Sequence, residues 1–154
     1  MATAGYRIAD EPIPGGLAHL TVNPVWCLFA VMFGGVWLSW PWFLLNAKAL
    51  GSPTLRRDVI FIVLSALGVA GLAFGGLLIG AELFRYYAVV LIAAKLVVSY
   101  RIFISQSRSF EIYSHFDGAV RNGMLVVAAG FFLRGRVLPE PDSLWSTVLL
   151  LVMS

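Results

Sequence analysis

Lys95 is the side chain whose type and position in this sequence point most clearly to chemistry. It lies within the apolar run 83–104, where a lysine costs about 2.5–3.5 kcal/mol on membrane-insertion scales unless it is paired, hydrated or able to reach the membrane surface. Arg101 follows about 9 Å further along a helix, so a slightly shifted helix would bring both cations to one surface. In the alternative, Lys95 faces a polar cavity or a carboxylate of a partner. Glu82 and Asp58 stand at the ends of apolar runs, so no proton relay within the chain is expected.

His115 and Asp117 are close enough in sequence to suggest metal binding or catalysis. A zinc site takes three or four protein ligands, and no third ligand accompanies this pair, so a solvated loop is expected. His19 falls in a polar tail. Cys27, the single cysteine, falls in an apolar stretch and is expected to be a small buried hydrophobe. The sequence has no phosphate-binding glycine loop, serine-nucleophile elbow or metal-binding histidine pair, so we predict no enzyme, no metal and no cofactor.

The composition indicates which solvent surrounds the chain. Apolar residues make up 60% of its 154 residues and charged residues 12%, against about 45–50% and about 25% in ordinary soluble domains. Too few polar side chains exist to coat a surface that faces water, so a lipid bilayer is the expected surrounding. The net charge is +3, but the 11 Lys and Arg residues lie mostly beside apolar segments. That placement is typical of membrane orientation and excludes a nucleic-acid-binding surface.

We therefore expect an all-α fold: an integral membrane bundle of about four transmembrane helices. A helix needs about 20 mostly apolar residues to cross the hydrocarbon core. Residues 1–23 form a polar N-terminal tail, and residues 24–154 form a single transmembrane domain. The predicted spans cover residues 25–45, 59–81, 83–104 and 119–138. A last short apolar segment, residues 144–153, is expected to be interfacial or packed on the bundle.

The spans differ in how clearly the sequence defines them. The second and third are separated by so few residues that they must form an antiparallel hairpin. The fourth reaches across only if Arg121 and Arg134 extend to opposite surfaces. A shallow hairpin of two half-depth helices is the alternative for this C-terminal third.

Loop charges predict the orientation, because short loops rich in Lys and Arg stay in the cytoplasm. The two most basic loops, 46–58 and 101–121, lie on one side, which places the N-terminal tail outside. Arg134 and Arg136 would then lie outside, against the rule. Gln106–Asn122 is expected as a loop with an amphipathic segment on the headgroups. A cluster of tryptophans beside Pro41 and several arginines lie near the basic loops. We predict that these residues anchor the bundle at the membrane interface: Trp37, Trp40, Trp42, Arg56, Arg57 and Arg101.

Small residues predict close helix packing. The second span contains two small-xxx-small patterns, which allow a neighbouring helix backbone to approach closely. A glycine pair in the first span offers a complementary notch. Whether the neighbour is another span of this chain or a second molecule stays open. The predicted packing residues are Gly34, Gly35, Gly68, Gly71, Gly75, Gly76 and Gly80.

The segment from Phe33-Gly34-Gly35 through Asn46 to Leu50-Gly51, with its basic turn and glycine-rich second span, resembles small uncharacterised multi-pass proteins of the bacterial inner membrane. The resemblance covers about a third of the chain and implies a bacterial inner membrane without a defined activity. The cluster of tryptophans around Pro41 departs from that pattern.

Two function classes remain. In the first, the chain is a non-enzymatic membrane interaction protein, an accessory subunit or an immunity-type protein, which acts through helix packing on a membrane protein partner or a second copy. In the second, it is a small transporter or channel subunit in which Lys95 faces a polar path. Loss of flux on Lys95→Ala would favour transport, and co-purification of one partner without flux would favour interaction. A membrane enzyme is a third class, but the sequence lacks the usual polar cluster at one membrane face.

Overall fold

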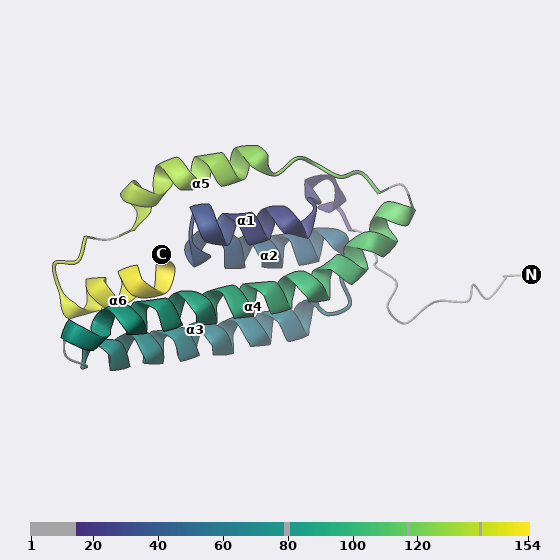
Figure 1. Ribbon diagram of the computed structural model, residues 1–154. Helices are drawn as coiled ribbons and strands as arrows, with labels where there is room; N and C mark the ends of the chain where they lie inside the picture. The colour runs from purple at the N-terminus through teal and green to yellow at the C-terminus, as the bar shows by residue number, and fades with distance from the viewer. Residues whose placement is uncertain (1–14, 79–80, 117, 139) are drawn as a thin grey trace, which may run out of the picture.

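The computed structural model is all-α, and about 80% of the chain is helical (Figure 1). It describes residues 15–78, 81–116, 118–138 and 140–154, with the side chains of 81–85 left out. After a short 3-10 helix, η1 (Ala18–Leu20), the α-helices are α1 (Pro24–Phe33), α2 (Val36–Leu50), α3 (Leu55–Leu77), α4 (Ala81–His115), α5 (Met124–Val137) and α6 (Leu144–Met153). The predicted all-α class is confirmed.

Helices α3 and α4 form the long antiparallel hairpin that the sequence predicted (Figure 1). At 1.5 Å per residue, α3 is about 35 Å long and α4 about 52 Å. These two helices, α4 from Tyr86 onward, are long and apolar enough to cross a bilayer. The expectation of a loop from residue 106 was wrong up to His115, where α4 ends. Neither glycine nor proline occurs between Leu83 and His115, so nothing in the backbone ends the helix where its apolar run ends.

The predicted first span, residues 25–45, is not one helix. Its helix ends at Phe33 and restarts at Val36, and α1 packs back against α2 as a hairpin. Gly35 has φ 98° and ψ 178°, a conformation that residues with a Cβ rarely adopt. The hairpin is closed by the hydroxyl of Ser39, which donates to the Cys27 carbonyl at 2.7 Å. Hydropathy cannot detect this reversal, because the turn contains no charged residue.

The C-terminal third consists of two short helices on different partners. Helix α5, about 21 Å long, packs on α1, and α6, about 15 Å long, packs on α3. Both are shorter than the hydrocarbon core of about 30 Å. The expected span 119–138 is therefore a helix of 14 residues, and the expected packed segment 144–153 is α6. Figure 1 shows α6 running back from the far end of the α3–α4 hairpin towards the α1–α2 turn.

The described part of the N-terminal tail, residues 15–23, lies at the basic end of the molecule, beside the α2–α3 turn and the last turns of α4. The Val22 amide donates to Asn46 Oδ1 at 2.9 Å, and the Tyr113 hydroxyl donates to the Ala18 carbonyl at 3.4 Å. The expectation that the tail and the basic loops lie at opposite ends was wrong. Because α1 and α2 reverse at Gly35, the chain returns to the end where it started.

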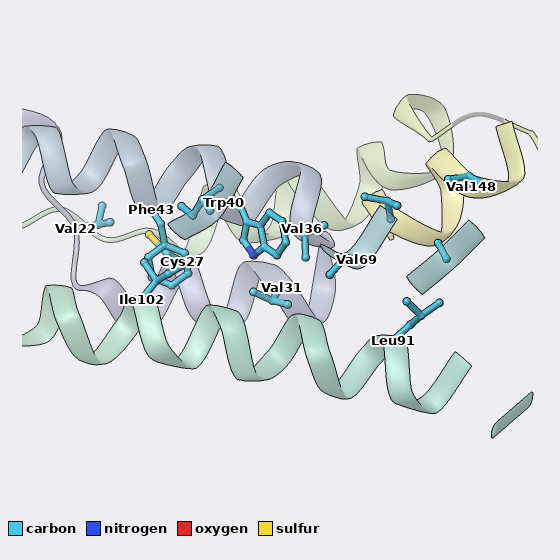
Figure 2. Packing of buried hydrophobic residues seen from close by; sticks show 13 residues of the cluster. Val22, Cys27, Val31, Val36, Trp40, Phe43, Val69, Leu91, Ile102 and Val148 are labelled. Carbon is cyan, nitrogen blue, oxygen red and sulfur yellow. The ribbon is translucent and has the colours of Figure 1, made fainter. Parts of the chain in front are cut away.

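The core lies where the α1–α2 hairpin rests on α4 (Figure 2). Phe43 and Cys27 have no exposed surface, and Ile102 of α4 is 1% exposed between the elements. Leu91 and Val69 continue the core towards α6. Cys27 is buried, as predicted. The apolar side chains in this interior bring the half-length helices onto the long hairpin and fix the positions of the polar groups between them.

Candidate functional site

Lys95 lies in the middle of α4 and is 5% exposed. Its Nζ donates a hydrogen bond to the carbonyl of Leu151 at 3.0 Å. Leu151 belongs to the last turn of α6, where unpaired carbonyls carry the negative end of the helix dipole. The structure thus pairs the lysine with the end of a helix. Arg134 of α5 is close enough for its positive charge to act on Lys95.

One turn along α4, Ser99 joins the same polar layer to α2. The Trp40 indole N–H donates to Ser99 Oγ at 3.0 Å, and Ser99 Oγ donates to the Lys95 carbonyl at 2.8 Å. Trp40 is 5% exposed and is a core residue, not the interfacial anchor that was expected. Trp37 donates its indole N–H to the Gly34 carbonyl at 2.6 Å, so it lies at the α1–α2 turn rather than near the basic loops.

The end of α6 also contacts the α1–α2 turn. A Cβ added to Gly35 would lie 2.6 Å from the Met153 carbonyl oxygen and 2.9 Å from that of Ser154. The turn, the middle of α4 and the last turn of α6 therefore meet at one point, which we call the central junction: Gly35, Trp40, Lys95, Ser99 and Leu151.

A second group of polar side chains lies at the basic end, between the start of α3 and the last third of α4. There a cavity of about 400 Å³ is lined by three arginines and three hydroxyl residues. We call it the arginine pocket: Thr54, Arg57, Arg101, Ser105, Arg108 and Ser109. The predicted anchors Arg57 and Arg101 thus share one cavity, whereas Arg56 is exposed and does not line it.

Hydrogen bonds between α3 and α4 hold the floor of the arginine pocket. Arg57 donates to Ser105 Oγ at 3.2 Å, and Ser105 Oγ donates to Asp58 Oδ1 at 3.2 Å. Thr54 donates to the other Asp58 oxygen at 3.1 Å. Asp58 is 4% exposed and lines a smaller cavity together with Arg57, Arg101 and Ser105. This network keeps the two helices in register at the basic end.

Sequence reasoning missed Arg108, Ser105 and Thr54 as members of this pocket. Arg101 and Arg108 are seven residues apart, which places them on one face of a continuous helix. That spacing was visible in the sequence, but the expected helix ended at residue 104. An expected loop gave no reason to place Arg108 beside Arg101.

The predicted packing glycines divide into two sets. A side chain at Gly76 would meet the Tyr87 ring of α4, and one at Gly75 would lie 3.2 Å from the Tyr87 hydroxyl. Around Gly68 and Gly71, by contrast, no other atom lies within 4 Å of an added Cβ. Gly34 packs against Leu38 of α2 at the hairpin turn, and the predicted Gly80 lies outside the described residues.

The histidines do not take part in either polar group. His115 is exposed and its ring packs edge-on against Phe116, with 5.7 Å between the ring centroids. Its sequence neighbour Asp117 lies outside the described residues. Within the part of the chain that the structure describes, no three histidine, cysteine or acidic side chains come together as a metal site.

Comparison of the chain with models of known protein families, with curated proteins and with solved structures finds no match.

Proposed function

We propose that the chain is a non-enzymatic, multi-pass interaction protein of the bacterial inner membrane. In this proposal the α3–α4 hairpin crosses the bilayer, with α1, α2 and α6 packed against it and α5 packed on α1. The protein acts by binding another membrane helix through α3, as an accessory subunit or an immunity-type protein would. The observation that carries the proposal is the exposure of apolar surface on both long helices.

In the most apolar 18 residues of α3 only 22% are buried, and in those of α4 only 28%. The core helix of a soluble protein would be mostly covered. Here the uncovered surface is apolar: Leu67 and Leu64 of α3 are 66% and 61% exposed, and Val97 of α4 is 68% exposed. Monomeric soluble proteins rarely expose large apolar patches to water. Lipid is the surrounding that this surface fits.

The polar groups inside the chain support binding over transport. A transporter or channel subunit would need Lys95 to face a polar path, but its Nζ is bonded to Leu151. Gln106, which has no exposed surface, donates to the Phe43 carbonyl at 2.9 Å and so joins α4 to α2. These bonds connect one helix to another, which is a structural use of polar groups.

The surface proposed for the partner is the open face of α3. Gly68 and Gly71 are three residues apart, so they share a side of the helix, whereas Gly75 faces Tyr87 of α4. At the first two, the space above the backbone is unfilled. A second helix can approach the backbone closely there, as at small-xxx-small contacts in membranes.

Cysteine labelling tests the membrane placement. In a Cys27→Ala background, the cysteines of Leu67→Cys and Val97→Cys are expected to react at least about tenfold more slowly than that of Ser114→Cys with a water-soluble maleimide. A polar reagent that enters hydrocarbon loses several kcal/mol, and about 1.4 kcal/mol is already a factor of ten. Membranes are opened by sonication so that both faces are accessible. Equal labelling of all three positions before denaturation would rule out the bilayer placement.

Glycine replacement tests the partner surface. Gly71→Ile fills the open face of α3 and is expected to abolish co-purification of the partner from mild detergent, whether another protein or a second copy of this chain. Gly135→Ile is the matched control, since Gly135 also has open space around it but lies on α5. Recovery of the same partner with both variants would show that α3 is not the binding surface.

A further inference from the structure

We propose that the arginine pocket binds a phosphate group, and that it takes this group from an anionic phospholipid headgroup. The binding site is separate from the open face of α3 to which the proposed function assigns the partner. The location of the arginine pocket at a bilayer surface depends on the proposed membrane placement. Phosphate recognition in the pocket does not depend on that placement.

The chemistry of the pocket matches a phosphate. Arg57, Arg101 and Arg108 surround one cavity, and guanidinium groups bind phosphate oxygens through paired, charge-assisted hydrogen bonds. Among the residues that the structure describes, the side chains of Arg101 and Arg108 form no hydrogen bond or ion pair. Their donors are therefore available to a ligand. Ser109 also lines the cavity, where its hydroxyl is hydrogen-bonded to that of Ser52 at 3.2 Å.

The nearby carboxylates leave the pocket positive. Asp58 is an acidic group beside the pocket, and the charges of Arg57 and Arg101 act on it. Both of its oxygens accept hydroxyl hydrogen bonds, from Thr54 and Ser105. Asp58 does not line the arginine pocket, but it lines a smaller cavity beside Arg57 and Arg101. Even when Glu111, three residues from Arg108 on α4, is counted beside Asp58, three arginines leave an excess of positive charge for an anion.

The shape of the pocket favours a phosphate that carries a lipid. Ile104 and Ile112 of α4 and Pro53 before α3 form apolar parts of its wall. Arg57 and Arg101 lie near the ends of the apolar runs of their helices, which is the depth of the headgroups in the proposed placement. Basic pockets between transmembrane helices at this level are typical of phospholipid headgroup sites.

The test compares two ligands on purified protein in a neutral detergent. Short-chain phosphatidylglycerol is titrated with native mass spectrometry as the readout, and inorganic phosphate is titrated by calorimetry. The variant Arg101→Gln/Arg108→Gln is expected to weaken phosphatidylglycerol binding by about tenfold or more, because charge-assisted bonds to phosphate are lost. Arg56→Gln, on the same helix turn as Arg57 but outside the pocket, is expected to bind like the unchanged protein.

Arginine-dependent binding of phosphatidylglycerol above that of inorganic phosphate supports a lipid headgroup site. Arginine-dependent binding of both ligands with equal affinity supports phosphate recognition but overturns the lipid source. Unchanged binding in the double variant, or an equal loss in Arg56→Gln, overturns the pocket altogether. The side chains of Arg101 and Arg108 form no hydrogen bond or ion pair within the described chain, so the double variant is expected to remain folded, which thermal unfolding checks. Cysteine labelling of α3 and α4 tests the membrane placement, and its outcome does not depend on the phosphate-binding results.

Discussion

Replacing Gly35 by alanine is expected to lower the free energy of unfolding by about 2–5 kcal/mol. Gly35 has φ 98° and ψ 178°, a backbone conformation that costs a residue with a Cβ about 1–3 kcal/mol. The added methyl would also lie 2.6 Å from the Met153 carbonyl oxygen. Backbone, unlike a flexible side chain, cannot move aside cheaply, so the α1–α2 turn and the end of α6 must separate.

Denaturant unfolding in mixed micelles, followed by helix circular dichroism, measures this loss. Gly68→Ala and Gly71→Ala are matched controls, because the same methyl there enters open space. Within a helix the change from glycine to alanine is expected to stabilise by about 0.5–1 kcal/mol. If Gly35→Ala unfolds at the same denaturant concentration as these controls, the contact between the turn and α6 does not exist in the protein.

The sequence allowed the α3–α4 hairpin to be predicted, since its determinants are local. Two apolar runs of sufficient length, separated by a few residues near Glu82, leave an antiparallel pair as the only arrangement. The reversal at Gly35 was not predictable in the same way. The run from Val25 to Leu45 contains no charge, and the backbone angle of one glycine decided between a single span and two half-length helices.

The polar groups show the same difference between local and distant determinants. The sequence singled out Lys95 correctly as a residue whose charge needs compensation, because position within an apolar run is a local property. It could not supply Leu151 as the partner, since that pairing joins residues 56 positions apart. The arginine pocket likewise combines Arg57 of α3 with Arg108 of α4. Only the packing of the long hairpin brings them to one cavity.

Lys95→Met is expected to change two measurements in opposite directions. Methionine retains an unbranched side chain but removes the charge and the hydrogen bond to Leu151. A hydrogen bond to a charged group contributes about 1.5–3 kcal/mol. Amide hydrogen exchange in α6 should therefore become about 10- to 100-fold faster, because the last turn of α6 loses its attachment to α4.

Membrane insertion of the isolated α4 segment should improve at the same time. Removing a lysine from the middle of an apolar helix recovers about 2.5–3.5 kcal/mol on insertion scales, which a translocon-insertion assay measures. Lys48→Met is the control in the exchange experiment, since Lys48 is exposed at the basic end of α2, and it should leave exchange in α6 unchanged.

The same variant separates the two function classes. If Lys95 fastens α6 to the hairpin, as its bond to Leu151 and its 5% exposure indicate, Lys95→Met alters α6 exchange, and proteoliposomes with or without the substitution carry no flux. If Lys95 instead faces a path for ions or solutes, the unchanged protein shows flux, the substitution abolishes it, and α6 exchange stays the same. The charge of Lys95 is costly inside a bilayer under either account, and hydrogen exchange measured beside flux distinguishes the two.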